Sequence, residues 1–189
     1  MLTIGHSTLP IDIFLRALKE NGVEQLIDIR TIPRSRHNPQ FGTEALAASL
    51  RLEGIDYLWM KDLGGLRRPQ RDSVNIGWRN TSFRGYADYM QTEEFAAAVA
   101  KLVVLDEEQI SAIMCSEAVP WRCHRSLVGD ALLVHDRPVE DIFVTPATGA
   151  THRKPHQLTS FAKVDGTRIW YPGDTVQQNL PLEKAAIRP

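Results

Sequence analysis

The sequence predicts an α/β fold: a three-layer sandwich whose middle layer is a mostly parallel five-stranded sheet, followed by a C-terminal arm with a short hairpin. Three observations predict it. Short apolar runs alternate with helix-periodic segments over residues 1–146, polar clusters follow the apolar runs, and the alternation ends after Thr145. Repeated strand–helix alternation is typical of parallel strands covered by helices on both faces.

Five apolar runs have the length and composition of buried strands. The first, "LTIG", ends at Gly5-His6-Ser7, and the fourth, "SAIMC", ends at a cysteine. The predicted strands are residues 2–5, 25–30, 55–60, 111–115 and 139–144.

Helical periodicity fills most of the intervals between these strands. In the first interval Ile11, Phe14 and Leu18 recur at helical spacing, and Gly22 is a C-terminal stop signal. The predicted helical segments are 11–22, 43–54, 86–104 and 125–136, and residues 61–85 form a long irregular segment.

After Thr145 the pattern changes. Residues 147–158 read as a polar connector, and 161–172 as a hairpin that turns at Asp165-Gly166. The last residues, rich in proline and charge, predict a loose tail. The sequence therefore predicts a core domain over 1–146 and a C-terminal extension over 147–189.

The composition is that of an ordinary globular protein, with 189 residues, 43% hydrophobic and 24% charged. A net charge of −1 excludes the global cationic field that drives non-specific nucleic-acid binding. No apolar run is long enough to span a bilayer, no secretory signal is present, and two cysteines do not make a disulfide framework. We therefore expect a cytoplasmic protein that has no membrane partner.

The candidate site follows from where the reactive residues lie. In open parallel sheets, ligands bind outside the carboxyl ends of the strands. Polar and charged residues gather after the predicted strands, whereas the helix-to-strand connections are plain turns. The candidate catalytic residues are Glu117, His124, Cys123 and His6, and the candidate substrate-binding residues are Ser7, Arg30, Arg34, Ser35, Arg122 and Arg125.

Anion recognition is the chemistry that this set favours. The start of the helix near Cys123 offers free amides and a positive dipole end, and guanidinium groups bind phosphate or carboxylate in pairs of hydrogen bonds. Glu117 and His124 then serve proton transfer, with His6 as a helper. We predict an enzyme acting on a small anionic substrate, phosphorylated or nucleotide-like. Arginine outnumbers lysine 16 to 6, which fits anion recognition and equally fits a GC-rich coding sequence.

Thiol chemistry is a second hypothesis. Cys115 ends a strand, as in cysteine phosphatases and rhodaneses, but Pro120 removes an amide donor from the loop and Glu117 repels an anion. Cys115 is more simply explained as a small buried strand residue, as free cysteines usually are. Cys123 is flanked by Arg122, His124 and Arg125, which stabilise a thiolate.

Metal and redox chemistry are less favoured. The Cys115–Cys123 spacing is not C-x-x-C, and no paired C-x₂₋₄-C or H-x₃₋₅-H pattern is present. We therefore expect no metal and no cofactor.

A non-catalytic nucleotide or nucleic-acid binding module is the rival to an enzyme. The segment "LRRPQRD" places three arginines on a long loop, and Tyr57, Trp59 or Trp121 would stack on bases.

Several motifs together carry a family resemblance. "TIGHS", "DIRTIPRSR", "DLGG", "GYADYM" and "IMCSEAVPWRCHR", in this order, resemble the family called domain of unknown function 488. The resemblance covers residues 2–146, its most specific part is Glu117 to Arg125, and "HQLTSFAKV" with "WYP" is similar to an extension common in that family. It implies a small α/β protein of bacterial type and carries no activity with it.

Overall fold

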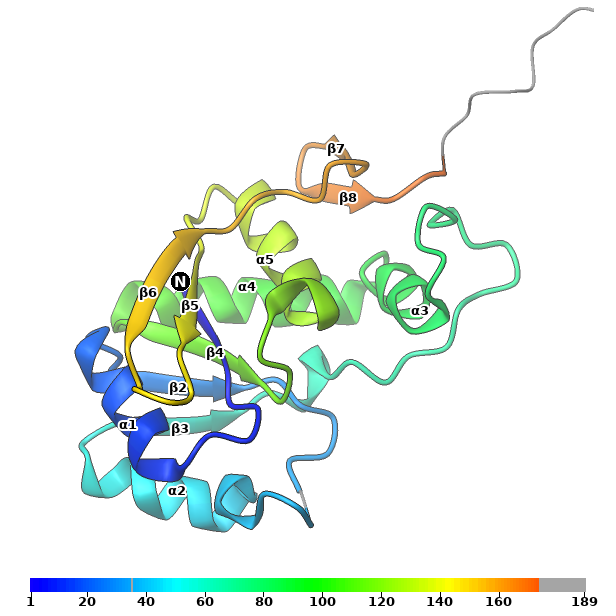
Figure 1. Cartoon of the computed structure of the whole chain (residues 1–189). Helices are drawn as coiled ribbons and strands as arrows, with labels where there is room; N and C mark the ends of the chain where they lie inside the picture. The colour runs from blue at the N-terminus through cyan, green and yellow to red at the C-terminus, as the bar shows by residue number, and fades with distance from the viewer. Residues whose placement is uncertain (35, 174–189) are drawn as a thin grey trace, which may run out of the picture.

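The computed structural model describes residues 1–34 and 36–173 and confirms the α/β fold (Figure 1). Its strands are β1 (Leu2–Gly5), β2 (Gln25–Asp28), β3 (Asp56–Trp59), β4 (Ser111–Cys115), β5 (Glu140–Val144), β6 (Thr151–Pro155), β7 (Lys163–Asp165) and β8 (Arg168–Trp170). Among these residues, one sheet has the order β3-β2-β4-β1-β5-β6, with β6 antiparallel and the other strands parallel. Strands β7 and β8 form a separate hairpin.

Helices cover both faces of the sheet and complete the three layers. They are α1 (Ile11–Glu20), α2 (Thr43–Leu52), α3 (Thr81–Tyr89), α4 (Glu93–Glu108) and α5 (Arg125–Val134), with short 3₁₀ helices η1 (Pro39–Phe41), η2 (Lys61–Leu63) and η3 (Pro120–Arg122). Helices α1 and α2 pack on one face, and α3, α4 and α5 on the other.

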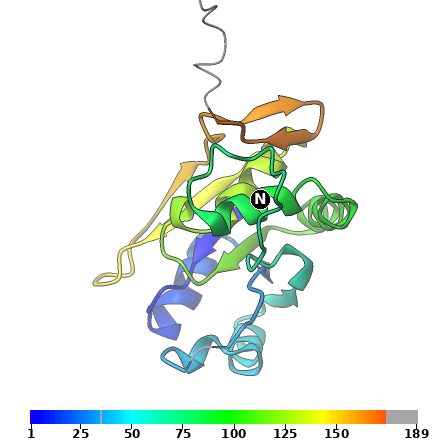
Figure 2. The same cartoon turned by 90° about the vertical axis from the view of Figure 1, so that its right-hand side faces the viewer.

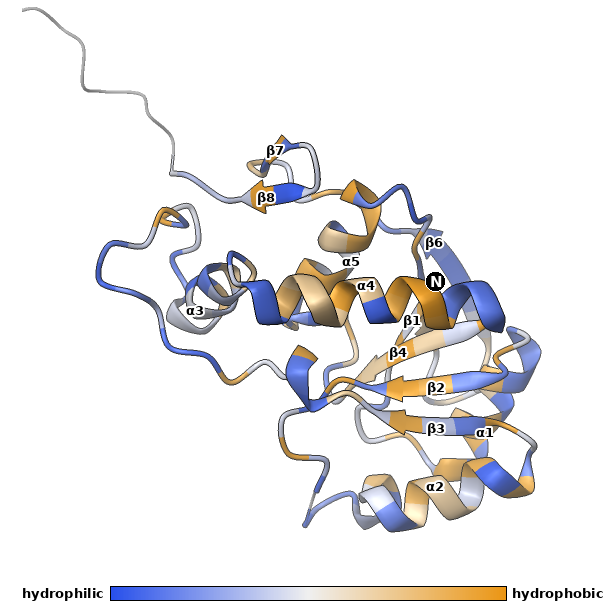
Figure 3. Cartoon of the chain, turned by 180° about the vertical axis from the view of Figure 1, so that it is seen from behind, coloured by the Kyte–Doolittle hydropathy of each residue, from blue (hydrophilic) through white to orange (hydrophobic). Residues whose placement is uncertain are grey.

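Alternation along the strands explains why both layers are well packed. Successive strand side chains point to opposite faces, so Met114 of β4 joins the core beneath α1 and α2, while Ile113 joins the core beneath α4 and α5. Strand β4 is largely apolar and β2 is buried along its whole length, whereas β6 is hydrophilic (Figure 3). This difference is expected between central strands buried on both faces and an exposed edge strand.

The structure differs from the prediction in three places. Strand β6 lies within the predicted polar connector and adds a sixth strand to the sheet. Helix α3 begins at Thr81, inside the predicted irregular segment, where Asn80 caps it by accepting from the amides of Ser82 and Phe83. The hairpin is confirmed, but its turn is Gly166-Thr167, one residue later than predicted.

The described part of the C-terminal extension, 147–173, packs onto the predicted core. Tyr171 is fully buried, its hydroxyl donates to Asp130 of α5 (2.8 Å), and its amide donates to Asn75 (2.9 Å). The hairpin lies beside α5 in both side views (Figures 1 and 2). The predicted loose tail, 174–189, lies outside the described residues.

The connectivity changes direction between β1 and β4. These strands are neighbours, but α1 follows β1 on one face of the sheet and α5 follows β4 on the other. Because the two connections leave on opposite faces of the sheet, the carboxyl ends of β1 and β4 form a topological switch point. Open α/β sheets bind ligands at such a switch point.

Candidate functional site

A cavity of about 830 Å³ lies at the carboxyl edge of the sheet, at this switch point. Its walls come from the segments after β1, β2 and β4, from the start of α3, and from Gly65-Leu66. It brings together most of the predicted site residues, namely His6, Ser7, Arg30, Arg34, Glu117, Arg122, Cys123 and His124.

Arg125 is not among the residues that line this cavity, which corrects its predicted role in substrate binding. Its side chain is 1% exposed. The guanidinium donates to the backbone carbonyls of Ile4 (2.8 Å) and Glu117 (3.1 Å), and more weakly to that of Ala118 (3.4 Å). Arg125 therefore ties the β4–α5 loop to β1. Ser35, predicted to bind substrate, lies outside the described residues.

Arg30 lies at the cavity wall, but its charge is already paired. It donates to both carboxylate oxygens of Asp28 (2.9 and 2.5 Å), to the Phe41 carbonyl (2.9 Å) and to His6 Nε2 (3.1 Å). Tyr57 donates to the same carboxylate (2.8 Å). A guanidinium has five N–H groups. These bonds use four of them, so one N–H on Nη1 remains available to the cavity.

His6 is held in a single neutral tautomer. Arg30 can only donate, so Nε2 of His6 accepts, and Nδ1 carries the proton that is donated to the Ser7 carbonyl (2.8 Å). Burial, assisted by the charge of Arg30, lowers the pKa of His6 to about 4. Both ring nitrogens are thus engaged by the protein. His6 is predicted to be a helper in proton transfer, and in the structure its Nε2 accepts from Arg30.

The loop after β1 approaches the β4–α5 loop closely. Ser7 has a positive φ of 46°, which is uncommon for a residue with a side chain, and its amide donates to the Ser116 carbonyl (2.9 Å). A Cβ at Gly5 would collide with the carbonyl oxygen of Glu117. Strained backbone of this kind is concentrated at functional sites.

Three charged side chains line the cavity without a partner among the described residues. Arg34, Glu117 and Arg122 are all exposed, and no hydrogen bond or ion pair engages their side chains within the described part of the chain. Two cations and one carboxylate thus remain available to a ligand.

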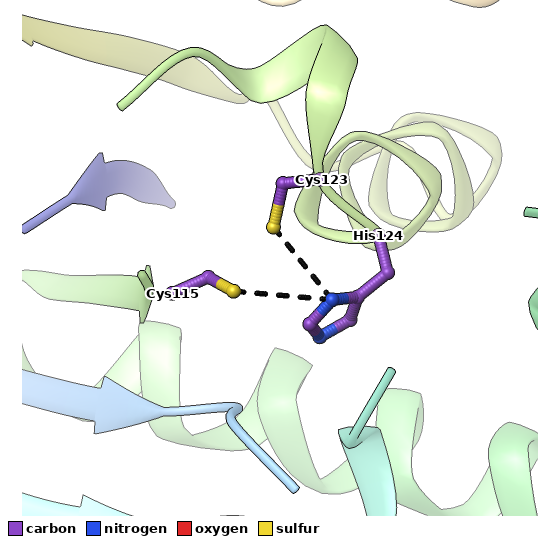
Figure 4. Close-up of side chains that lie close together, drawn as sticks. All are labelled: Cys115, Cys123 and His124. Carbon is purple, nitrogen blue, oxygen red and sulfur yellow. Dashed lines mark hydrogen bonds between the residues drawn. The ribbon is translucent and has the colours of Figure 1, made fainter. Parts of the chain in front are cut away.

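Two cysteines and a histidine meet at the wall of the same cavity (Figure 4). Cys115 is the last residue of β4, and Cys123 and His124 directly precede α5. His124 Nδ1 lies 3.9 Å from Cys115 Sγ and 3.6 Å from Cys123 Sγ. On the other side of the ring, Nε2 lies 3.1 Å from the Ile29 carbonyl. Since a carbonyl only accepts, Nε2 carries the proton, and the lone pair of Nδ1 faces the two sulfur atoms.

The pKa values of the two thiols shift in opposite directions. The nearby thiol of Cys123, together with His124, lowers the pKa of Cys115 well below its ordinary value. The nearby thiol of Cys115, reinforced by burial, raises the pKa of Cys123. The geometry therefore favours Cys115 as the more acidic thiol, whereas the flanking cations in the sequence pointed to Cys123.

The aromatic residues predicted to stack on a base lie elsewhere. Tyr57 binds Asp28, Trp59 donates to the Arg30 carbonyl (2.9 Å), and Trp121 is 64% exposed and packs near Phe143. None of them lines the cavity. Among the described residues, the one phenylalanine, tyrosine or tryptophan that does is Phe83 of α3. The sequence analysis missed it because Phe83 lies within the predicted irregular segment, 61–85.

The arginines of "LRRPQRD" do not act as one group. Arg67 donates to the carbonyls of Gly64 (3.1 Å) and Asp62 (3.0 Å), and its guanidinium lies 3.5 Å from the centre of the Tyr89 ring. It therefore fixes the loop after η2. Arg68 and Arg71 are exposed and do not line the cavity.

A family described as "Domain of unknown function DUF488" matches residues 10–132. This range includes Cys115, Cys123 and His124 and most of the residues that line the cavity. Comparison with curated proteins and with solved structures gives no match for this chain. Within the described residues, no helix has both the length and the apolar character needed to cross a bilayer.

Proposed function

Because this chain belongs to the DUF488 family, whose description assigns no activity, we propose a function from its own cavity: an enzyme that binds a small anionic substrate, phosphorylated or nucleotide-like. The substrate binds at the carboxyl edge of the sheet, between the loops that follow β1 and β4. A cytoplasmic location accompanies this proposal, since a reducing compartment keeps the two buried cysteines as free thiols.

The observation that supports anion binding is the pair of guanidiniums at the cavity that have no partner among the residues that the structure describes. Arg34 and Arg122 come from different loops, after β2 and after β4, and line one cavity. The remaining N–H of Arg30 adds a donor that Asp28 and His6 hold in place. Hydrogen bonds from guanidinium to phosphate or carboxylate are charge-assisted and are roughly twice as strong as neutral ones.

Glu117 is the proposed proton-transfer group. It is the carboxylate that lines this cavity without an internal partner among the described residues, and it lies in the same loop as Arg122. Bound substrate would place its reacting hydroxyl or leaving group near this carboxylate, and a carboxylate in that position acts as a general base or acid.

Titration calorimetry with inorganic phosphate and adenosine monophosphate tests the binding site. We expect Arg34→Ala and Arg122→Ala each to weaken binding of both probes at least ~10-fold, the loss of one charge-assisted contact. Arg68→Ala is the matched control, because Arg68 is equally exposed but lies outside the cavity. It should leave both affinities unchanged.

Glu117→Gln separates binding from chemistry. It should retain phosphate affinity and abolish turnover of any phosphorylated or nucleotide substrate that stabilises the wild-type chain in a thermal-shift screen. A contrary result is phosphate affinity that both cavity substitutions leave unchanged but that Arg68→Ala lowers. If that affinity also falls steeply with salt, the chain has a nucleic-acid binding surface and the proposal is refuted.

A further inference from the structure

The end of β4 and the start of α5 bring three metal-binding atoms together. The Sγ atoms of Cys115 and Cys123 and a ring nitrogen of His124 all lie within 4.8 Å of one another. We propose that these three residues bind one divalent cation of the zinc class, with a fourth coordination position open to the cavity. The site is distinct from the proposed anion contacts, which use other residues.

The interatomic distances fit a tetrahedral ion. Zinc–sulfur bonds of about 2.3 Å and zinc–nitrogen bonds of about 2.0–2.1 Å, at the tetrahedral angle, separate the sulfur and nitrogen ligands by about 3.6 Å. The two observed separations, from His124 Nδ1 to Cys123 Sγ and to Cys115 Sγ, are 3.6 and 3.9 Å. The same geometry separates two sulfur ligands by about 3.8 Å, and the Sγ atoms of Cys115 and Cys123 lie within 4.8 Å of each other. A cation can therefore occupy the centre of the cluster once the two sulfur atoms approach each other by up to about 1 Å.

Hydrogen bonds from neighbouring residues orient the donor atoms of the cluster toward one another. The Ile29 carbonyl holds the Nε2 proton of His124, so the Nδ1 lone pair faces the sulfur atoms. Metal-bound histidines are commonly oriented by such a second hydrogen bond. The amide of Arg125 donates to Cys123 Sγ (3.4 Å), a contact that stabilises negative charge on a metal-bound sulfur.

The ligands are held on rigid elements. Cys115 belongs to a strand buried along its whole length. The ring of His124 packs against Gly65, where a Cβ would collide with Nδ1, and lies 5.0 Å from the centre of the Tyr86 ring. These contacts prevent the imidazole from turning away from the sulfur atoms, so the donor set is formed before an ion arrives.

The donor set selects the class of ion and leaves one position open. Two thiolates and a neutral imidazole suit zinc, and magnesium and calcium prefer oxygen ligands. The cluster comprises only these three side chains among the described residues, and all three line the cavity. Three protein ligands with an open fourth position are typical of catalytic rather than structural zinc sites. Water or a cavity ligand would complete the tetrahedron.

Cobalt titration of the full-length, metal-depleted chain under a thiol-free reductant tests the site. One Co²⁺ per chain should bind, with a thiolate-to-cobalt charge-transfer band in the near ultraviolet and visible bands of tetrahedral intensity. Zn²⁺ should displace it. Cys115→Ser, Cys123→Ser and His124→Gln should each weaken zinc binding by at least ~100-fold, more than a typical loss of an outer-shell partner. Near-ultraviolet circular dichroism verifies that these variants fold.

The matched control is Arg122→Ala, which should bind cobalt as the wild-type chain does while losing phosphate affinity. This separates failure of the metal site from failure of the proposed anion site. Absence of the charge-transfer band, or equal zinc affinity in folded Cys115→Ser and Cys123→Ser variants, would overturn the metal site. Alkylation of Cys115 by iodoacetamide at the same rate with and without stoichiometric zinc would also overturn the metal site. Such a result would mean that zinc does not bind the Cys115 sulfur, which would then be a free thiolate next to His124.

Discussion

Arg122 and Arg125 are three residues apart, but their guanidinium groups lie in opposite environments. Arg122 is exposed at the cavity, whereas Arg125 is buried and donates to backbone carbonyls of β1 and the β4–α5 loop. The first can respond to a ligand, and the second stabilises the loop that holds the site.

Substitution should separate these two roles. Arg125→Ala leaves buried carbonyls without a donor, and we expect it to lower the free energy of unfolding by about 3 kcal/mol or more. Arg122→Ala should change the same quantity by less than about 0.5 kcal/mol, as is usual for surface sites. Urea unfolding of both variants measures the difference. Equal unfolding midpoints would contradict the structural role of Arg125.

For single residues, the sequence predicts which side chains lie at the carboxyl edge of the sheet, but not which partner each side chain has there. The rule that ligands bind beyond the strand ends correctly brings Arg30, Arg34 and Glu117 to one cavity. It does not reveal that Asp28 neutralises Arg30, because that pairing depends on side-chain conformation after the strand ends. The sequence does not favour a metal site at the cysteine–histidine cluster, because the geometry of the cluster comes from the folding back of loop 116–122 and not from any regular spacing.

Between elements, a buried histidine joins the C-terminal extension to the sheet and to α5. His156, directly after β6, interacts with Asp141 of β5 (3.0 Å) and Asp130 of α5 (3.2 Å). Burial alone would lower the pKa of His156, but hydrogen bonds and charge from the two carboxylates outweigh it and raise the pKa to about 9. The ring is therefore protonated between two acids at neutral pH.

Stability should depend on pH through His156. Because its folded-state pKa lies above the ordinary value of 6.5, its stabilisation is fully present below that pH and is lost as the pH rises through about 9. The contribution is about 3 kcal/mol at most. Wild-type unfolding free energy should fall relative to that of His156→Gln between pH 6.5 and 9, measured by urea unfolding. Parallel pH profiles for the two chains would contradict this account.

Elements with apolar periodicity were predictable, and β6 was not. Its residues, "THRKP", are polar and mostly exposed, and the strand exists because its backbone pairs with β5. Edge pairing satisfies backbone groups without burying side chains on both faces, so it leaves little trace in the hydropathy pattern.

Over the whole molecule, the cavity depends on strand order, which the sequence does not reveal. The alternation of strands and helices predicts a parallel sheet, and β4 lies between β2 and β1 although it comes late in the chain. That insertion creates the switch point at which the loops after β1 and β4 meet. The carboxyl edge could therefore be predicted, and the crevice could not.

The boundary predicted after residue 146 can be tested by truncation. A chain of residues 1–146 lacks β6, which pairs with β5, and the buried side chains of Ile169 and Tyr171. We expect it to lose cooperative thermal unfolding and near-ultraviolet circular dichroism, because the edge of β5 and part of the core become exposed. Cooperative melting at the full-length temperature would show that residues 1–146 are an independent domain.

Gly5 limits which substitutions the wall of the cavity can accept. The last residue of β1 touches the backbone of Glu117, where even a single additional carbon has no room. Any substitution there must push the Glu117 segment outward and thereby move the Glu117 carboxylate that lines the cavity. Variation in the cavity wall is consequently freer on the far rim, around Arg34 and Phe83, than at the junction where two strands end side by side.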